Sequence, residues 1–194
     1  MKRIFDFMLA GAGIVASLPF AALISAAIWL EDGGPVFYKQ TRVGKNGKLF
    51  QLLKFRTMKP DAEKELGPVQ ALRDDPRITR VGKFLRKTAL DELPQLWNIF
   101  IGEMSFVGPR PLRPDEILVH GNKRTKLQDL PGYEERHQVA PGLTGLAQVY
   151  APRDLPHDQK IIYDLRYVRR QNFFLDLKLI FLSFIRTFSG RWEV

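Results

Sequence analysis

The chain begins with an apolar block flanked by charges. The basic pair Lys2-Arg3 precedes an uncharged stretch from 7 to 30, and the acidic pair Glu31-Asp32 ends it. About 20 consecutive apolar residues are enough for a helix to cross a bilayer. A cleaved signal peptide also starts with basic residues, but its apolar core is usually shorter, about 7 to 15 residues. The pattern therefore favours a helical segment embedded in a membrane.

Pro19 lies in the middle of this apolar block. A proline inside a helix removes one backbone hydrogen bond and bends the helix. Two arrangements fit the residues. One is a helix-break-helix whose two short limbs enter and leave the membrane by the same face, with Pro19 as the break. The other is a transmembrane helix that tolerates its proline.

Two β-rich runs follow, from 36 to 43 and from 48 to 57, and Lys45-Asn46-Gly47 separates them. Asn-Gly between two such runs is a strong β-hairpin signal. We therefore predict a short β-hairpin here. It brings four basic side chains near one another, and on a strand face these are solvated by default: Lys39, Arg42, Lys54 and Arg56.

The next helical patterns surround a pair of carboxylates. Residues 78 to 87 form a basic amphipathic pattern, typical of helices that lie on membranes or face water. Proline is tolerated only in the first turn of a helix, so Pro94 predicts a helix that starts near Asp91 and ends at Gly102. An acidic pair, Asp91-Glu92, would then occupy its first turn.

The C-terminal third has four recognisable stretches. Residues 112–130 are polar with a helical pattern, and 141–148 form a tight Gly-rich and Pro-containing loop. Residues 158–170 form an amphipathic helix. The helix expected over 173–188 has a wide apolar face interrupted by charges. We expect it to lie at the membrane interface or against the first segment; a buried core helix is the simpler alternative.

Length and pattern together predict the fold class. A chain of 194 residues is long enough for one domain with a real core, and too short for two of ordinary size. We expect two parts that form one functional unit, a membrane helix over 1–32 and an interfacial domain over 33–194. The predicted class is α+β, mainly helical, with a short β-hairpin and amphipathic interfacial helices.

Composition limits the partners and cofactors. The formal net charge is +9, which indicates anionic partners such as nucleotides, nucleic acid or an anionic lipid surface. The sequence contains no cysteine, and its three histidines lack the spacing of zinc ligands. Any metal must therefore be bound by oxygen, and beside phosphates Mg²⁺ is the natural choice.

Asp91 and Glu92 are the main chemical candidates. A helix N-terminus stabilises an ionised carboxylate and also binds phosphate, so a positioned Asp91 can act as a nucleophile. Acidic residues are common in first turns, however, and these two residues alone favour simple charge complementation of a helix start.

Motifs along the whole chain shift that balance. They resemble, in order and spacing, the bacterial sugar transferases that are small monotopic phosphoglycosyl transferases. The matching stretches are KRIFDF at 2–7, GGPVFYKQTRVGKNGKLFQLLKFRTM at 33–58, DDPRITRVGKFLRKTALDELPQL at 74–96, DELPQLWNIFIGEMSFVGPRP at 91–111, PGLTGLAQV at 141–149 and YDLRYV at 163–168.

The resemblance implies a reaction at the cytoplasmic face of the bacterial inner membrane. Family members transfer a phosphosugar from a UDP-sugar to a polyprenol phosphate such as undecaprenyl phosphate and release UMP. They enter one leaflet through a re-entrant helix-break-helix, made by a Ser-Pro pair where this chain has Leu18-Pro19. The resemblance therefore implies that 1–32 is a re-entrant membrane helix and that 33–194 is the catalytic domain, with a shallow active site. The implied partners are thus a UDP-sugar, a polyprenol phosphate and inner-membrane lipid.

The resemblance also implies roles for individual residues. Asp91 attacks the sugar-linked phosphorus to give a covalent aspartyl phosphosugar, which the polyprenol phosphate then displaces. Asp91 and Glu92 hold Mg²⁺, or Glu92 instead accepts a proton from the acceptor. The implied positive charges for the phosphates come from Lys54, Arg86 and Arg110. Asp164 either orients an arginine near the catalytic pair or forms an ordinary surface ion pair.

Two functions of other classes compete with this one. A membrane-anchored nucleic-acid-binding protein fits the basic charge, but the chain has no recognisable nucleic-acid-binding motif, so we expect no nucleic-acid partner. A non-catalytic scaffold for polysaccharide assembly predicts that Asp91→Asn is silent. Neither the sugar nor the oligomeric state is set by a motif in the sequence.

Overall fold

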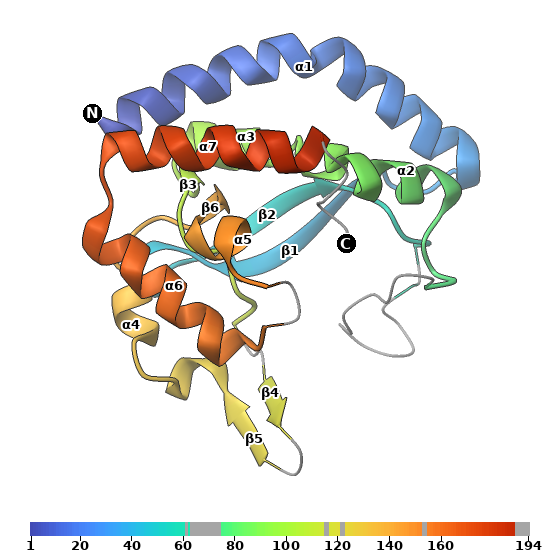
Figure 1. The fold of residues 1–194 in the computed structure, drawn as a ribbon. Coiled ribbons are helices and arrows are strands. Elements are labelled where there is room, and N and C mark those ends of the chain that lie inside the picture. The colour runs from blue at the N-terminus through green and yellow to red at the C-terminus, as the bar shows by residue number, and fades with distance from the viewer. Residues whose placement is uncertain (61, 63–74, 115–116, 121–122, 153–154, 189–194) are drawn as a thin grey trace.

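The computed structural model describes residues 1–60, 62, 75–114, 117–120, 123–152 and 155–188. Its elements stack in layers (Figure 1). Helix α1 (Lys2–Asp32) arches over one side, and α2 (Arg80–Thr88), α3 (Gln95–Ile101) and α7 (Phe173–Phe188) lie beneath it. The β1–β2 hairpin and the β3–β6 pair form the middle, and α4, α6 and the β4–β5 hairpin lie on the far side. The predicted α+β, mainly helical class is confirmed.

The remaining elements are short. The strands are β1 (Phe37–Val43), β2 (Leu49–Phe55), β3 (Ser105–Val107), β4 (Ile117–His120), β5 (Lys123–Lys126) and β6 (Gly142–Thr144). The other α-helices are α4 (Tyr133–Arg136), α5 (Leu146–Tyr150) and α6 (His157–Arg170). Three 3₁₀ turns are η1 (Lys45–Gly47), η2 (Leu90–Glu92) and η3 (Leu127–Asp129).

Helix α1 is one continuous helix of 31 residues with Pro19 inside it. The helix-break-helix with two separate limbs, one of the two predicted arrangements, is therefore not confirmed, because the helix is not interrupted at Pro19. Instead the helix curves (Figure 1). A proline removes a single N–H from the ladder, so the helix can continue through it with a bend. Pro19 and its neighbours Leu18 and Phe20 are exposed, at the part of the arch between the two buried ends.

Each half of α1 packs on its own apolar cluster. Ala10 belongs to a cluster with Leu52 and Ile99, whereas Ile24 and Ile28 pack with others around Phe55 and Leu85. Glycine makes the close approach to α3 possible: a Cβ at Gly11 would meet the Phe100 ring at 3.3 Å. The burial of these apolar side chains holds the helix along the body rather than away from it.

Polar contacts also join both ends of α1 to the same body. At the start, Lys2 Nζ lies 2.6 Å from Asp176 Oδ2 on α7, and Arg3 donates to carbonyls at the end of α3. At the other end, Glu31 accepts hydrogen bonds from the first backbone N–H groups of α2, at 2.7 and 3.1 Å. The charged groups that flank the apolar stretch are therefore held by a single folded unit.

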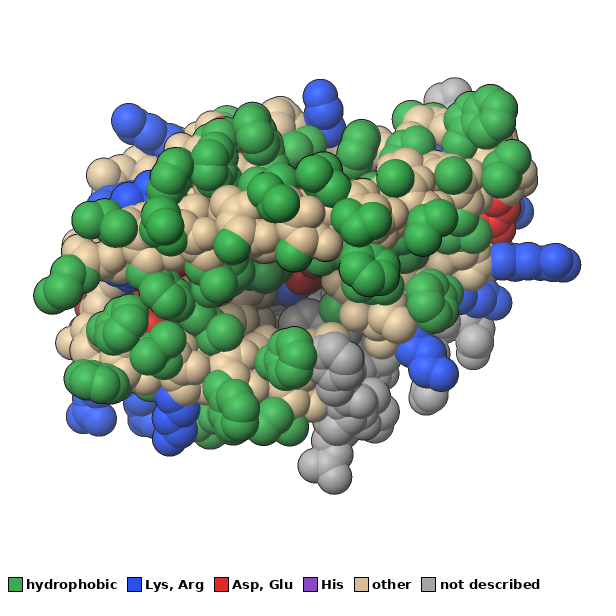
Figure 2. Space-filling model, turned by 90° about the horizontal axis from the view of Figure 1, so that it is seen from above, with side chains coloured by type: hydrophobic (Ala, Val, Ile, Leu, Met, Phe, Trp, Pro, Cys, Tyr) green, Lys and Arg blue, Asp and Glu red, His purple; other side chains and the backbone are tan. Residues whose placement is uncertain are grey.

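The outer side of α1 and α7 forms an apolar face. Figure 2 shows hydrophobic side chains gathered over it, with Lys and Arg around its margin. Its exposed members on the two helices include Ile4, Met8, Val15, Leu18, Phe20, Leu23, Trp29, Leu30, Phe174, Phe181 and Phe184. Within the described residues, α1 is the one helix long and apolar enough to cross a membrane. Contiguous exposed apolar surface of this kind marks a membrane or partner contact.

The predicted β-hairpin is confirmed. Strands β1 and β2 pair antiparallel, with Tyr38 opposite Lys54 and Arg42 opposite Phe50. Asn46 and Gly47 take left-handed conformations, with φ of 56° and 75°. Asparagine and glycine tolerate this region better than other residues, which explains why the chain reverses here.

The helix predicted to start at Asp91 begins later. Thr88 ends α2, Ala89 turns the chain with φ of 55°, and Asp91 lies in η2 before α3 begins at Gln95. The predicted end is confirmed, because Gly102 has φ of 96° and closes α3. Asp91 is thus held in a tight turn between two helices rather than as the cap of one.

The helix predicted over the polar stretch 112–130 is not found in the described part of that stretch, so this prediction is wrong. That part contains the antiparallel strands β4 and β5 and the turn η3. The amphipathic helix over 158–170 and the apolar helix over 173–188 are confirmed as α6 and α7, and α2 covers most of the basic amphipathic pattern. The loop at 141–148 is tight: β6 pairs parallel with β3, and a Cβ at Gly142 would lie 2.1 Å from Gly108 N.

Candidate active site

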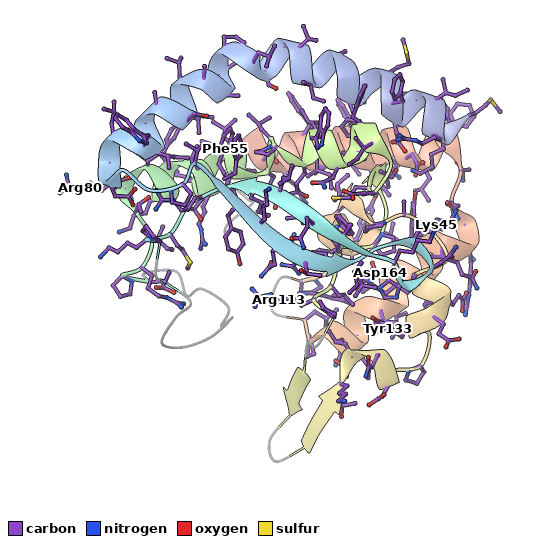
Figure 3. All side chains as sticks on the ribbon, turned by 180° about the vertical axis from the view of Figure 1, so that it is seen from behind. Lys45, Phe55, Arg80, Arg113, Tyr133 and Asp164 are labelled. Carbon is purple, nitrogen blue, oxygen red and sulfur yellow. The ribbon has the colours of Figure 1, made fainter. Side chains whose placement is uncertain are left out.

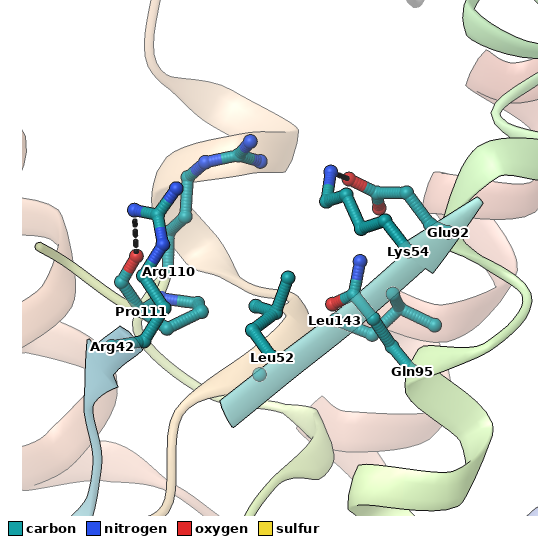
Figure 4. A pocket seen from close by; sticks show the side chains of 9 residues that line it. Arg42, Leu52, Lys54, Glu92, Gln95, Arg110, Pro111 and Leu143 are labelled. Atoms are coloured by element: carbon teal, nitrogen blue, oxygen red, sulfur yellow. Dashed lines mark hydrogen bonds and ion pairs between the residues drawn. The ribbon is translucent and has the colours of Figure 1, made fainter. Parts of the chain in front are cut away.

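A small pocket opens between the hairpin, the turn η2 and two loops (Figure 4). The hairpin supplies one wall from β1 and β2, η2 and α3 supply another, and the loop after β3 faces the start of β6. Most of its polar lining is charged and basic, with one carboxylate. The lining residues are Arg42, Leu52, Lys54, Glu92, Gln95, Arg110, Pro111, Gly142 and Leu143.

Lys54 brings the two candidate carboxylates together. Its Nζ lies 2.6 Å from Glu92 Oε1 and 3.7 Å from Asp91 Oδ2. Lys54 projects from β2, and the tight turn η2 presents Asp91 and Glu92 to it. Asp91 is only 9% exposed. The single ammonium group of Lys54 therefore pairs with two adjacent carboxylates, and both carboxylates are largely buried.

This arrangement separates the pKa values of the two carboxylates. Burial raises the pKa of Asp91 to about 6, the Glu92 charge adds to the rise, and Lys54 and Arg86 oppose it. For Glu92, burial also acts to raise the pKa, but the charges of Lys54 and Arg110 and the hydrogen bond from Lys54 outweigh it, so its pKa is lowered. Glu92 is therefore firmly ionised at pH 7, while Asp91 titrates closer to neutrality.

The opposite wall carries two arginines. In Figure 4 the side chains of Arg42 and Arg110 lie across the pocket from Lys54 and Glu92. Arg42 Nη1 donates to the carbonyl oxygen of Pro111 at 2.9 Å. Two guanidinium groups and one ammonium group facing a pocket of this kind suit a ligand with several anionic oxygens, such as a diphosphate.

The four basic hairpin residues do not all reach this pocket. Arg42 and Lys54 line it, but Arg56 is buried in an ion pair with Asp32 at the end of α1. Lys39 is exposed on β1. The hairpin face therefore divides its charges between the pocket and the attachment of α1.

Arg86 and Asp164 lie outside the pocket lining. Arg86 Nε donates to Thr57 Oγ1 at 2.9 Å, and its charge acts on Asp91 from α2. Asp164 is 4% exposed on α6, and its Oδ2 lies 2.7 Å from Nε of Arg136. This ion pair is buried, so it is not an ordinary surface pair, and its arginine, Arg136, was not singled out from the sequence.

The donor set suits a hard divalent cation. In the described ranges, no group of three or more His, Asp or Glu side chains forms a ready metal site. Asp91 and Glu92 do offer two adjacent carboxylates beside a basic pocket. Mg²⁺ commonly binds through one or two carboxylates together with substrate phosphates and water, so these residues fit it as a substrate-dependent site.

The chain is similar in sequence to known proteins over most of its length. It is 39% identical over 195 residues to the UDP-glucose:undecaprenyl-phosphate glucose-1-phosphate transferase of Klebsiella pneumoniae, covering 98% of this chain and 40% of that protein. It is 39% identical over 194 residues to the exopolysaccharide production protein ExoY of Rhizobium meliloti, covering 93% and 82%.

A third relative is more similar over a shorter stretch. The putative undecaprenyl-phosphate N-acetylgalactosaminyl 1-phosphate transferase of Bacillus subtilis is 53% identical over 136 residues, covering 70% of this chain and 72% of that protein. The chain spans about two fifths of the length of the Klebsiella protein. The sequence profile of the bacterial sugar transferases matches residues 1–190. The chain therefore belongs to the bacterial sugar transferase family.

Proposed function

We propose that this protein is a phosphoglycosyl transferase that moves a phosphosugar from a UDP-sugar to undecaprenyl phosphate or a similar polyprenol phosphate, and releases UMP. The relatives' names describe transfers of this kind. The observation that carries the proposal is the buried Asp91 beside Lys54 and Glu92, at the edge of a pocket with arginines on its opposite wall. The family's link to exopolysaccharide production supports a role at the start of glycan assembly.

The proposed chemistry has two displacement steps. In the first, an oxygen of Asp91 forms a bond to the phosphorus that carries the sugar, and the bond from that phosphorus to the UMP oxygen breaks. In the second, a phosphate oxygen of the polyprenol carrier attacks the same phosphorus. The bond to Asp91 then breaks, which frees the carboxylate and leaves the sugar on a polyprenyl diphosphate.

The surrounding charges support both steps. Lys54, Arg110 and Arg42 place fixed positive charge where the diphosphate and the leaving UMP carry negative charge, and Arg86 adds a more distant one. Glu92 holds Lys54 in place and remains ionised, so it can also accept the last proton of the acceptor phosphate. Mg²⁺ held by Asp91, Glu92 and substrate oxygens would neutralise part of the diphosphate charge.

The proposed setting is the cytoplasmic face of the inner membrane, with α1 in one leaflet. Supporting this, both ends of α1 are bonded to the same body, whereas a helix that spans the bilayer must place its ends on opposite sides. The apolar face would meet the lipid, and the pocket would meet the nucleotide from the cytosol.

Cysteine labelling tests this arrangement. A cysteine added before Met1 and Pro35→Cys should both be labelled from the cytosolic side of inverted vesicles. Labels on opposite sides would contradict the re-entrant arrangement.

The reaction is tested by UMP release from a panel of UDP-sugars with enzyme in nanodiscs, with and without Mg²⁺ and undecaprenyl phosphate. Asp91→Asn should lower the rate by about 10³-fold or more, because it removes the nucleophile. Asp129→Asn is the matched control: it changes an exposed carboxylate in η3, and its rate should stay within about two-fold. A scaffold without catalysis would give no UMP from any sugar.

The covalent step has its own readout. Without acceptor lipid, the wild-type protein incubated with its UDP-sugar should gain the mass of one phosphosugar on the peptide that contains Asp91. Asp91→Asn should show no such gain. If UMP is released only when the acceptor lipid is present, and rapid quenching finds no adduct, the result would instead favour direct transfer between the two substrates.

A further inference from the structure

The loop that carries Arg110 is held at four consecutive carbonyls, from Pro109 to Leu112. Pro109 and Pro111 flank Arg110 and have no N–H group, so this loop can form few hydrogen bonds within itself. Its carbonyls instead accept from donors on other elements. The pairs are Gly142 N to Pro109 O, Arg136 Nη2 to Arg110 O, Arg42 Nη1 to Pro111 O and Val43 N to Leu112 O. Among the described residues, the donor to the Arg110 carbonyl is Arg136.

Arg136 is a buried cation with a partner for each guanidinium nitrogen. It is 2% exposed at the end of α4. Nε donates to Asp164 at 2.7 Å, Nη1 lies 3.2 Å from His137 Nε2, and Nη2 donates to the Arg110 carbonyl. The planar fork of an arginine can satisfy these three directions at once, and the single ammonium of a lysine cannot.

His137 completes the arrangement as a neutral acceptor. Its Nδ1 lies 2.7 Å from the Tyr133 carbonyl oxygen, which requires a proton on Nδ1 and leaves Nε2 free to accept from Arg136. Burial and the Arg136 charge lower the pKa of His137 to about 4. The backbone of His137 also reaches the hairpin, because its carbonyl accepts from Asn46 N at 2.6 Å.

We propose that Arg136, held by Asp164 and His137, is a positioning residue for Arg110, and that it sets the affinity of the pocket for the anionic oxygens of the nucleotide substrate. This inference rests on the proposed function. The Arg110 side chain is exposed toward the pocket, while its carbonyl faces the buried Arg136. The loop thus couples a buried ion pair on α4 and α6 to the wall of the pocket.

A double-mutant cycle tests whether Arg136 acts through Arg110. The variants are Arg136→Lys, Arg110→Ala and the double variant, with KM, kcat and UMP release measured in nanodiscs. Alone, Arg136→Lys should raise KM for the UDP-sugar about 10-fold or more, with a smaller change in kcat. In the Arg110→Ala background it should add less than about three-fold, because residues that act as one unit are not additive. Full additivity would overturn the inference.

Arg169 offers a matched control on the same two helices. Its guanidinium bonds Glu135 at 2.6 and 2.8 Å, so this pair also joins α6 to α4, but Arg169 is 64% exposed and does not contact the loop. Arg169→Lys should leave KM within about two-fold. If it raises KM as much as Arg136→Lys does, docking of α4 on α6 is sufficient to explain the effect and the inference is wrong.

Two further readouts keep the outcomes separate. Should Arg136→Lys fail to fold, Asp164→Glu enters the same cycle in its place, since it keeps the charge that pairs with Arg136 but shifts the carboxylate that orients it. Binding of UMP, measured by calorimetry on each variant, reports positioning without turnover and should show the same non-additivity. If wild type releases UMP and Arg110→Ala is silent, the inference fails while the proposed reaction stands. If wild type releases none from any UDP-sugar, it is the proposed reaction that fails.

Discussion

The protein contains two buried charge clusters that are built on opposite principles. In the pocket cluster (Lys54, Asp91 and Glu92), two carboxylates share one ammonium group. In the clamp cluster (Arg136, His137 and Asp164), one carboxylate faces one guanidinium whose nitrogens all have partners (Figure 3 labels Asp164). The first cluster has an excess of negative charge that a metal cation can meet. The second is internally matched, which suits a fixed support.

The two clusters should also differ in their effect on the free energy of unfolding. A buried carboxylate whose pKa is raised destabilises the folded state when it ionises, whereas a paired and hydrogen-bonded one does not. With Asp91 ionised, the pocket cluster should therefore lower the free energy of unfolding, as reactive groups commonly do, whereas the clamp cluster should raise it. Breaking each cluster in turn makes this comparison quantitative.

The largest expected change in stability comes from the clamp cluster. Asp164→Asn leaves the Arg136 guanidinium buried without its counter-charge, and removing one partner of a buried ion pair typically costs about 3 to 5 kcal/mol. Thermal unfolding in detergent should show a large drop in midpoint. A drop no larger than that of an exposed pair would mean that the cluster relaxes easily, which would weaken its role as a fixed support.

The pocket cluster should respond in the opposite direction. The pKa of Asp91 is about 6 in the folded state against 3.8 ordinarily, so the folded state binds the proton more tightly, and stability falls as pH rises between these values. Asp91→Asn mimics the protonated form. It should be more stable than wild type at pH 8 by on the order of 2 to 3 kcal/mol, and equal to it near pH 4. A gap that does not change with pH would contradict this account.

A shift in the pH profile should follow from Lys54→Met. In the proposed mechanism Asp91 must be ionised to attack, so kcat/KM of the wild type should rise with pH through about 6. The Lys54 charge lowers the pKa of Asp91, and its removal should move this rise to higher pH. The measurement is the UMP release rate from pH 5 to 9. A lower plateau with an unmoved rise would show that Lys54 binds substrate without tuning Asp91.

The smallest effect belongs to the exposed pair on the clamp helices. Glu135→Gln removes the partner of Arg169 at the surface, where such pairs contribute about 0 to 1 kcal/mol. The unfolding midpoint should change by no more than a degree or two, and activity should be unaffected. Set beside Asp164→Asn, this variant isolates the contribution of burial, because both substitutions break an Arg–carboxylate contact between α4 and α6.

Local signals predicted the elements that depend on local rules. Asn46-Gly47 predicted the hairpin turn, because both residues tolerate the left-handed region that the turn adopts. Gly102 predicted the end of α3 for the same reason. The apolar patterns predicted α1 and α7, since their exposed apolar residues are as visible in the sequence as buried ones.

The errors arose where the chain departs from those rules. Ala89 takes a left-handed conformation that alanine rarely adopts, so the sequence did not show that a turn separates α2 from the carboxylate pair. The β4 strand is a run of only four residues, ILVH, too short to show whether its period is that of a helix or of a strand. The β5 strand, KRTK, has no apolar residue to alternate, and its lysines and arginine suit a helix equally well.

For the site, residue type and resemblance identified Asp91, Glu92, Lys54 and Arg110, and the structure brings these four together. Arg42 was recognised only as part of a basic strand face. Arg136 was missed because it is one of 30 basic residues, and nothing in its sequence neighbours shows that it is buried. Burial of a charge is a tertiary property, so it becomes visible only when α4, α6 and the Arg110 loop are placed side by side.

The proline-flanked loop also bears on how binding free energy divides between enthalpy and entropy. Prolines restrict the chain before it folds, and the four anchored carbonyls restrict Arg110 afterwards. Little backbone disorder is then left to lose when a nucleotide arrives. The backbone entropy of this loop is lost when the protein folds, not when the nucleotide binds. Nucleotide binding in the pocket can therefore be driven by the enthalpy of the contacts, with only a small opposing entropy change.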